Sequence, residues 1–519
     1  MSDDRIASSP SVGSWNPRTG VTEAEVPQTT PAELETLLAS AAEAADVLRE
    51  TPAVVRAAWI RAVAEVLEQH RDELVELADR ETGLGPQRLS GELARTTGQL
   101  GLFEQVLADG AFLDVVIDHA DPQGGAAVVP DLRRVLEPLG VVLVFSASNF
   151  PFAFSVAGGD TASALAAGCP VLVKAHEGHV CLSVRVGELI RGALVEAGAP
   201  AGAFGIVVGF DAGVAALRDR RVAACGFTGS VKGGLALQAI AQDREEPALF
   251  FGELGSLNAV VVTPEAAEAR GSSIGSGFAT SMLLGNGQFC TKPGVLLVPE
   301  THSADLLSSA LEALEAAPAA PLLTERIRDG YRDGLATLQE AGAAILRLGG
   351  VEPREGAWAT PSLFLTDADT FSSGPAELRD ECFGPAALVV TYRDQESLDR
   401  AIGQLPGALT GTVHAEPHEQ VGARVTRQLS RRVGRVIWNG WPTGVAVSWA
   451  MQHGGPFPAT TSPQHTSVGA SAVHRFLRPV VYQSVPDEVM PPVLRDENAH
   501  ATPRRVDGAL LPGAAAARV

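Results

Sequence analysis

Short β-branched runs alternate with helical patterns in the middle of the chain, and this alternation gives the first indication of the fold. The apolar runs are residues 141–145, 171–173, 206–208 and 223–227. Between these runs, apolar residues recur at helical spacing. Strands that alternate with helices predict a doubly wound parallel sheet, which binds ligands at the carboxyl ends of its strands. We therefore expect this part of the chain to hold a cofactor.

The segments on either side of this sheet have different patterns. A polar lead-in extends to about residue 30, and residues 31–49 and 52–81 then predict amphipathic helices. After Glu253, a second α/β domain is predicted from further apolar runs, at 259–262, 295–298 and 387–390. The residues from about 487 to 519 lack periodicity, so we expect a loosely held tail there.

Length, composition and charge narrow the classes of function. A chain of 519 residues with 45% hydrophobic residues is large enough for two or more packed domains, and disorder throughout is excluded. The formal net charge of −21 would repel a phosphate backbone or an anionic membrane. We therefore expect neither a nucleic acid nor a membrane as partner.

The cysteines indicate a reducing compartment. There are five, an odd number, and no two have the Cys-x-x-Cys spacing that binds zinc or forms a redox pair. They are Cys169, Cys181, Cys225, Cys290 and Cys382. The polar, acidic N-terminus does not resemble a signal sequence. These features predict a cytoplasmic protein without a metal site.

One cysteine and one glutamate stand out as candidate catalytic residues. Cys290 follows Gly287-Gln288-Phe289, a setting of glycine and polar residues that is unusual for a cysteine that only fills a core. Glu253 lies within the apolar run around Phe251 and Leu254. Together they suggest a thiol that attacks a carbonyl and a carboxylate that activates water or the thiol.

Six segments in register carry a resemblance to a known family. They are Ser148-Asn149-Phe150-Pro151, Val173-Lys174, Phe227-Thr228-Gly229-Ser230, Gly252-Glu253-Leu254-Gly255, Gly287-Gln288-Phe289-Cys290 and Glu381-Cys382-Phe383-Gly384-Pro385. Over about residues 30–485, the chain resembles the aldehyde dehydrogenase superfamily. It is most similar to the α-ketoglutaric semialdehyde (2,5-dioxovalerate) dehydrogenases, because Ala147-Ser148 precede Asn149 where many members have Pro-Trp. That branch also includes relatives that act on long-chain fatty aldehydes.

The resemblance implies an α/β fold with three parts. A doubly wound, parallel dinucleotide-binding domain would comprise residues 1–117 and 139–252, and a second α/β catalytic domain residues 253–446. A small β oligomerisation arm would be formed by residues 118–138 and 474–487, followed by a tail at 488–519. The family pattern implies a homodimer or homotetramer.

The resemblance also assigns roles to residues. Cys290 would attack the aldehyde, the Asn149 side chain and the Cys290 backbone N–H would stabilise the oxyanion, and Glu253 would activate the water that hydrolyses a thioester. Asparagine before Phe150-Pro151 also suits a turn, so a structural role for Asn149 stays open.

The cofactor would be NAD or NADP. Lys174 resembles the contact to the adenosine ribose, Gly229 and Ser230 open a helix that could meet a pyrophosphate, and Glu381 and Phe383 resemble the residues at the nicotinamide ribose and ring. Glu177 would accept hydrogen bonds from ribose hydroxyls and repel a 2′-phosphate, which favours NAD. Lys174, His176 and His179 could instead bind a 2′-phosphate, so NADP stays open as the cofactor.

The substrate and the outcome of the reaction have alternatives. An α-keto carboxylate needs a cation in the pocket, and the sequence does not single out an arginine. A fatty or other aliphatic aldehyde needs an apolar tunnel instead. Aromatic residues suit the wall in either case: Phe150, Phe154, Phe289, Trp441, Trp449 and Phe457. A cofactor-free thioesterase, acyl transfer to coenzyme A and a non-catalytic relative are the remaining alternatives.

Overall fold

A computed structural model describes residues 10–121 and 129–513 of the chain. Its first sheet has five parallel strands in the order β7-β6-β5-β8-β9. They are β5 (Val141–Phe145), β6 (Val171–Lys174), β7 (Phe204–Val207), β8 (Val222–Thr228) and β9 (Leu249–Glu253). The prediction of a doubly wound parallel sheet is confirmed.

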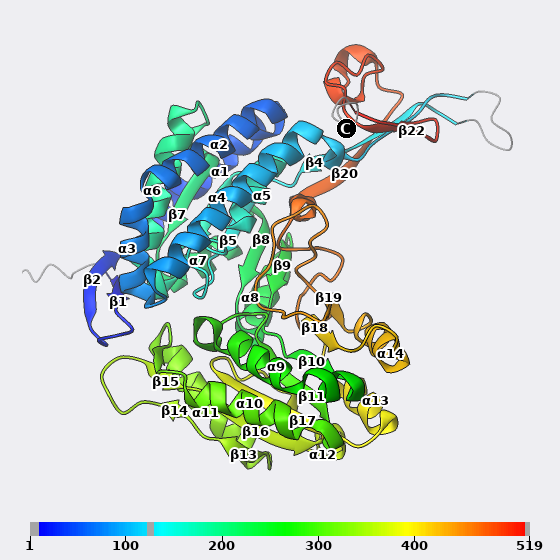
Figure 1. The fold of residues 1–519 in the computed structure, drawn as a ribbon. Coiled ribbons are helices and arrows are strands. Elements are labelled where there is room, and N and C mark those ends of the chain that lie inside the picture. Colours follow the sequence, from blue (N-terminus) through cyan, green and yellow to red (C-terminus); the bar gives the residue numbers. More distant parts are fainter. Residues whose placement is uncertain (1–9, 122–128, 514–519) are drawn as a thin grey trace, which may run out of the picture.

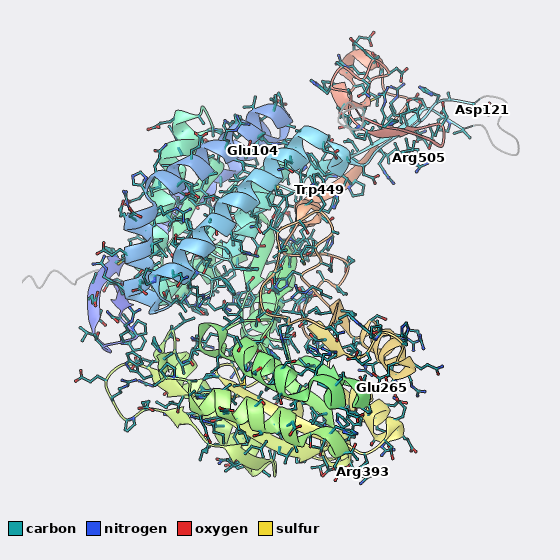
Figure 2. All side chains as sticks on the ribbon, viewed as in Figure 1. Glu104, Asp121, Glu265, Arg393, Trp449 and Arg505 are labelled. Carbon is teal, nitrogen blue, oxygen red and sulfur yellow. The ribbon has the colours of Figure 1, made fainter. Side chains whose placement is uncertain are left out.

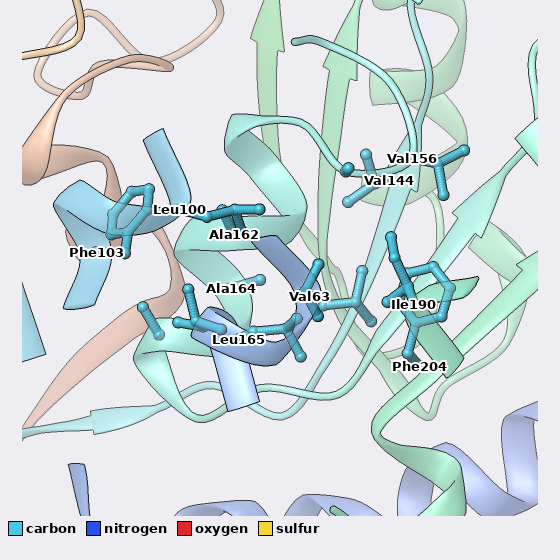
Figure 3. Packing of buried hydrophobic residues seen from close by; sticks show 14 of the residues in the cluster. Val63, Leu100, Phe103, Val144, Val156, Ala162, Ala164, Leu165, Ile190 and Phe204 are labelled. Atoms are coloured by element: carbon cyan, nitrogen blue, oxygen red, sulfur yellow. The ribbon is translucent and has the colours of Figure 1, made fainter. Parts of the chain in front are cut away.

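Helices cover both faces of this sheet. Val142 and Val144 of β5 pack with α2, α4, α5 and α6 (Figure 3). Leu143 and Phe145 point to the other face and pack with α1, α7 and α8. The helices are α1 (Pro31–Glu50), α2 (Ala53–Gln69), α3 (Arg71–Thr82), α4 (Pro86–Asp109), α5 (Gly159–Ala167), α6 (Val180–Glu196), α7 (Phe210–Arg218) and α8 (Val231–Gln242). The helical pattern expected over 52–81 is interrupted at His70, whose φ and ψ of −105° and 17° separate α2 from α3.

The second sheet has seven strands in the order β13-β16-β17-β11-β10-β18-β19, parallel except for β13. They are β10 (Asn258–Val262), β11 (Pro293–Pro299), β13 (Ala344–Arg347), β16 (Ser362–Asp367), β17 (Ala386–Tyr392), β18 (Ala408–His414) and β19 (Val433–Trp438). Its helices are α9 (Pro264–Leu283), α10 (Ala304–Glu315), α11 (Glu325–Glu340), α12 (Ala368–Ser373), α13 (Gln395–Gln404) and α14 (Gln420–Leu429). A small sheet of β12 (Ala320–Pro321), β15 (Trp358–Thr360) and β14 (Gly350–Val351) lies beside it. The predicted second α/β domain is therefore present.

A third sheet projects from these two bodies (Figure 1). Its order is β20-β4-β3-β21-β22. The strands are β3 (Val115–Asp118), β4 (Leu132–Pro138), β20 (Leu477–Gln483), β21 (Arg504–Val506) and β22 (Ala509–Leu511). Figure 2 shows Asp121 and Arg505 on this projection, far from the body that carries Glu265 and Arg393. Part of the expected arm, residues 122–128, lies outside the described residues, and its role in oligomerisation stays a prediction.

The ends of the described chain differ from the sequence-based expectation. Instead of a loose tail, residues 504–511 form a hairpin whose first strand, β21, pairs in parallel with β3. Arg504 fixes this segment by donating to the carbonyls of Arg495 and Asp496, both at 2.6 Å. The polar lead-in likewise contains a hairpin, β1 (Ser11–Trp15) and β2 (Thr22–Pro27). Backbone pairing, which leaves little trace in an aperiodic sequence, accounts for both differences.

Among the described residues, no helix combines the length and the apolar character that crossing a membrane requires.

Candidate active site

Cys290 lies in a loop whose path depends on left-handed backbone. Residues 285–287 have φ values of 58°, 53° and 71°. A Cβ atom on Gly287 would come within 2.2 Å of the Gly384 carbonyl oxygen, so glycine is required there. The Asn258 side chain, at the start of β10, donates to the Cys290 carbonyl at 2.8 Å. These contacts hold the cysteine against the second sheet.

A histidine lies between Cys290 and Glu253. Nε2 of His453 is 3.6 Å from the Cys290 Sγ and 2.8 Å from Oε1 of Glu253. The Ser467 hydroxyl donates to the other oxygen of Glu253. His453 and Glu253 are both buried. A single nitrogen faces both partners, so Nε2 can accept the thiol proton only while it is unprotonated, and it can donate to Glu253 only once it carries that proton.

The ligand atoms of Cys290, His453 and Glu253 lie within 4.8 Å of one another, a spacing that a metal ion can also use. However, two ligands that bind one zinc ion at roughly 2.0–2.1 Å in tetrahedral geometry are about 3.3 Å apart. The 2.8 Å between His453 Nε2 and Glu253 Oε1 is shorter than the separation of two ligands of one zinc ion. The arrangement therefore fits proton transfer better than metal binding.

The charges at this site keep the sulfur protonated at rest. Burial, and then the negative charge of Glu253, raise the pKa of Cys290 well above its ordinary value. Burial also acts to raise the pKa of Glu253, but the charge of His453 and hydrogen bonds from His453, Ser467 and Cys290 bring it below its usual value. Glu253 is thus a carboxylate and Cys290 a thiol that must lose its proton before it attacks.

Asn149 lies directly after β5 and faces the Cys290 loop. Its Nδ2 donates to the Gln288 carbonyl at 2.9 Å, and its own carbonyl accepts a hydrogen bond from Arg88 at 2.8 Å. An amide nitrogen carries two hydrogens, so the bond to Gln288 leaves one for another acceptor. The structure brings Asn149 to the same loop as Cys290.

The expected cofactor residues line one edge of the first sheet. Lys174 ends β6 and pairs with Glu177, and Ser230 is the N-cap of α8, where its hydroxyl accepts from the Gly233 N–H at 3.1 Å. Gly229 N donates to the Glu253 carbonyl at 3.0 Å. The strands of this sheet are parallel, so their carboxyl ends lie at the same edge. The segments that follow β5, β6 and β8 therefore meet the end of β9 there.

Glu381 and Phe383 lie in the segment before β17. The Glu381 carboxylate accepts from the Ser256 N–H at 3.0 Å, and burial raises its pKa to about 7, although Lys292 opposes the shift. The Lys292 ammonium donates to the carbonyls of three residues of this segment, Cys382, Gly384 and Ala386, at 2.7, 3.1 and 2.7 Å. Two residues downstream of Cys290 in sequence, Lys292 thus ties the cysteine loop to Glu381. Phe383 is half-buried.

Comparisons with known proteins identify the family. The model of the aldehyde dehydrogenase family matches residues 6–478. The chain belongs to the aldehyde dehydrogenase family. It is 45% identical to α-ketoglutaric semialdehyde dehydrogenase 2 of Azospirillum brasilense over 92% of this chain and 91% of that enzyme. It is 41% identical to the α-ketoglutaric semialdehyde dehydrogenase of Acinetobacter baylyi over 88% of this chain and 87% of that enzyme.

Solved structures agree on the fold. The NAD-dependent aldehyde dehydrogenase from Sinorhizobium meliloti superimposes with a TM-score of 0.77 at 22% identity, covering 92% of this chain and 93% of that one.

As an aldehyde dehydrogenase, this protein is an enzyme that oxidises an aldehyde with NAD or NADP as the hydride acceptor. The family expected from the six motifs is confirmed.

The sequence analysis did not single out His453, Ser467, Arg88 or Arg95 as residues of this aldehyde dehydrogenase's site. His453 lies in an aperiodic loop after β19, and its one signal was a titratable side chain directly before a glycine pair, Gly454-Gly455. Segment 453–467 reaches Glu253 because the Leu254 N–H donates to the Ala459 carbonyl at 2.8 Å.

The aromatic residues considered for the pocket separate into two groups. Phe150 contacts the rings of Phe154 and Phe289 with centroids 5.5 and 4.9 Å apart, and Phe154 lies 5.8 Å from the ring of His453. By contrast, Trp441 packs with the core of the second sheet, and Trp449 and Phe457 are largely exposed. Of these six described aromatic residues, the first group therefore lies beside His453 and the Cys290 loop.

Proposed function

We propose that this enzyme oxidises α-ketoglutaric semialdehyde to 2-oxoglutarate through a thioester on Cys290. The observation that carries the chemistry is the contact of His453 with both the Cys290 sulfur and the Glu253 carboxylate. The substrate is supported by the two relatives above, which carry the name of this semialdehyde and align with most of the chain.

The first step is attack of the Cys290 sulfur on the aldehyde carbon. His453 takes the thiol proton, and Glu253 stabilises the imidazolium that results. The carbonyl oxygen becomes an alkoxide, which accepts hydrogen bonds from the free Nδ2–H of Asn149 and from the Cys290 backbone N–H. One such donor typically lowers the barrier by about 2.7–4 kcal/mol.

The residues at the sheet edge suit a nicotinamide dinucleotide. The N-terminus of α8 at Gly229 and Ser230 would hold the pyrophosphate, Lys174 and Glu177 the adenosine ribose, and Glu381 and Phe383 the nicotinamide ribose and ring. The chemistry that the cofactor supplies when bound is acceptance of a hydride, after which a thioester remains on the sulfur. NAD is the preferred cofactor in this proposal, because the Glu177 carboxylate would repel a 2′-phosphate.

Glu253 completes the reaction. It accepts a proton from a water molecule as the water oxygen attacks the thioester carbonyl. The sulfur leaves as a thiolate and recovers the proton held by His453, the carboxylic acid is released, and Glu253 gives the proton taken from water to the solvent. A carboxylate whose pKa is kept low by His453 and Ser467 is ionised at neutral pH and ready to act.

The projecting sheet supports a second proposal, that the enzyme forms a homodimer or homotetramer. Its strand β20 lies at the edge of the sheet and exposes Val481. An edge strand with an apolar side chain is a surface on which another copy can add. Size-exclusion chromatography with light scattering measures the assembly, and a Val481→Lys variant should shift it towards the monomer.

A substrate panel tests the proposed reaction. Reduction of NAD is followed with α-ketoglutaric semialdehyde, succinic semialdehyde, pentanal and a long-chain aldehyde. The highest kcat/KM is expected for α-ketoglutaric semialdehyde, and Cys290→Ala should abolish turnover of all four. Faster turnover of the long-chain aldehyde would replace the proposed substrate, and turnover by Cys290→Ala would reject the mechanism.

A further inference from the structure

One face of helix α4 carries charged side chains towards the active site. Arg88, Glu92 and Arg95 are spaced by four and three residues, so they share a face of the helix. Glu92 accepts the backbone N–H groups of Phe152 and Ala153 at 2.9 and 3.0 Å. This face therefore packs against the loop that follows Asn149.

The two arginines of this face are placed differently. The Arg88 guanidinium lies 5.3 and 4.8 Å from the ring centroids of Phe150 and Phe289 and donates to the Asn149 carbonyl. Arg88 thus holds the loop that contains Asn149 and Phe150 in place. Arg95 lies 5.4 Å from the ring centroid of Phe154, the phenylalanine that contacts His453. Arg95 is therefore the arginine nearer to the reacting groups.

Arg95 has an unused hydrogen-bond donor. Its Nε donates to the Val445 carbonyl at 3.2 Å, whereas its Nη1 is shielded from solvent and has no hydrogen-bond partner in the part of the chain that the structure describes. A buried guanidinium nitrogen without an acceptor is unfavourable unless a ligand supplies one. Carboxylates match the planar fork of arginine best.

The local charges also favour an anion. Burial lowers the pKa of Arg95, and electrostatic interactions with Glu92, Cys290 and Glu253 oppose the shift, which places Arg95 within electrostatic reach of the reacting sulfur. Glu92 is a weak counter-charge, because its own burial raises its pKa even beside Arg88 and Arg95.

We propose that Arg95 binds the carboxylate of the semialdehyde while the aldehyde carbon meets Cys290. This inference rests on the proposed function and adds the residue that selects acidic aldehydes over neutral ones. Phe154 beside Arg95 would exclude water from the carbon chain between the two ends, which would strengthen the ion pair.

The test compares one acidic and one neutral aldehyde of equal chain length. Arg95→Met keeps the aliphatic stem but removes the charge. We expect kcat/KM for α-ketoglutaric semialdehyde to fall about 10- to 150-fold, the range for a hydrogen bond to a charged group, while kcat/KM for pentanal stays constant or rises. An equal fall for both aldehydes, or no fall for either, would overturn the proposal. Arg95→Lys, which keeps the charge, should restore part of the preference.

A second variant separates recognition from loop anchoring. Arg435 of β19 donates to the carbonyls of Pro442 and Gly444, in the loop that Arg95 also holds at Val445. Arg435→Met should therefore lower turnover of both aldehydes alike. The Nε of Arg435 is also buried without a partner among the described residues, and Arg435 also lies within electrostatic reach of Cys290, so a selective loss in Arg435→Met would assign the carboxylate to Arg435 and overturn the proposal. Arg61→Met, which removes an exposed ion pair to Glu104 of α4, should change neither rate.

Product binding provides a readout that does not depend on turnover. 2-Oxoglutarate should inhibit the wild type competitively and lose affinity in Arg95→Met. Failure of the proposed substrate is recognised in the wild type, as a preference for pentanal over every acidic aldehyde. Failure of the Arg95 assignment is recognised when the wild type prefers the semialdehyde and Arg95→Met keeps both that preference and the inhibition.

Discussion

Nε2 of His453 lies 2.8 Å from Oε1 of Glu253, although all strands of the second sheet lie between the two residues in the chain. The pair forms because the segment after β19 returns to β9, where Thr460 makes a β-bridge with Glu253. The proton acceptor for Cys290 is therefore assembled from both ends of the catalytic half and exists only in the folded protein.

Replacing the histidine tests its role as that acceptor. His453→Gln should slow the hydride burst and steady turnover together by about 10²- to 10⁴-fold, because only the Glu253 carboxylate, a weaker base than imidazole, then remains in contact with the thiol. Stopped-flow absorbance of the reduced cofactor measures both phases. His465→Gln is a matched control in the same segment, since the ring of His465 packs on Phe251 instead. A normal burst in His453→Gln would remove the histidine from the attack step.

Glu253→Gln should separate the two halves of the reaction. The amide cannot accept the proton of water, so steady turnover is expected to fall by about 10²-fold or more while the first burst falls much less, because losing the carboxylate beside the imidazolium is offset by a lower pKa of Cys290. Rapid-quench detection of the acyl enzyme by mass spectrometry should show the thioester on Cys290 accumulating. Steady turnover at the wild-type rate would rule Glu253 out as the base for hydrolysis.

The pKa of Cys290 predicts how its reactivity depends on pH. Burial and Glu253 raise this pKa well above the ordinary value, so the thiolate fraction is small at neutral pH and grows as the pH rises. Alkylation by iodoacetamide should therefore be slow at about pH 7 and accelerate up to about pH 10. In Glu253→Gln the curve should move to lower pH. Peptide mapping identifies the alkylated cysteine, and a rate independent of pH would contradict the raised pKa.

The sequence was sufficient for the sheets and for residues that local motifs mark. The apolar runs at 141–145 and 171–173 became β5 and β6 because strands buried on both faces are continuously apolar. Motifs singled out Cys290, Glu253 and Asn149, and the structure brings the three residues together, while their roles stay a prediction. Local patterns predict these features because each depends on neighbours in the chain.

The remaining features depend on contacts between distant segments. His453 and Ser467 lie in an aperiodic loop, and their position is set by hydrogen bonds such as that from the Ser467 N–H to the His453 carbonyl at 2.9 Å. Arg95 looks like any surface arginine of an amphipathic helix until the loop carrying Val445 packs against it. Periodicity reports which face of an element is buried, but not what it is buried against.

Glu381 predicts a pH dependence for cofactor binding. Its pKa of about 7 means that the carboxyl is protonated below this pH and ionised above it. Only the ionised form accepts hydrogen bonds with both oxygens, so the Kd for NAD should rise as the pH falls below about 7. Fluorescence titration at several pH values measures this, with exposed Glu377→Gln as control. Glu381→Gln should bind weakly at every pH, and an unchanged pH profile in this variant would assign the dependence elsewhere.

The contact between Lys174 and Glu177 predicts how the choice of cofactor can be changed. In the wild type, the Glu177 carboxylate occupies the ammonium of Lys174 and would repel a 2′-phosphate. Glu177→Gln removes the repulsion and frees the ammonium for the phosphate. The ratio of kcat/KM for NADP to that for NAD should rise about tenfold, equivalent to about 1.4 kcal/mol in relative binding. Glu188→Gln, an exposed carboxylate on α6, serves as the control. If the ratio stayed constant in Glu177→Gln, the carboxylate would not face the ribose, and the preference for NAD would need another source.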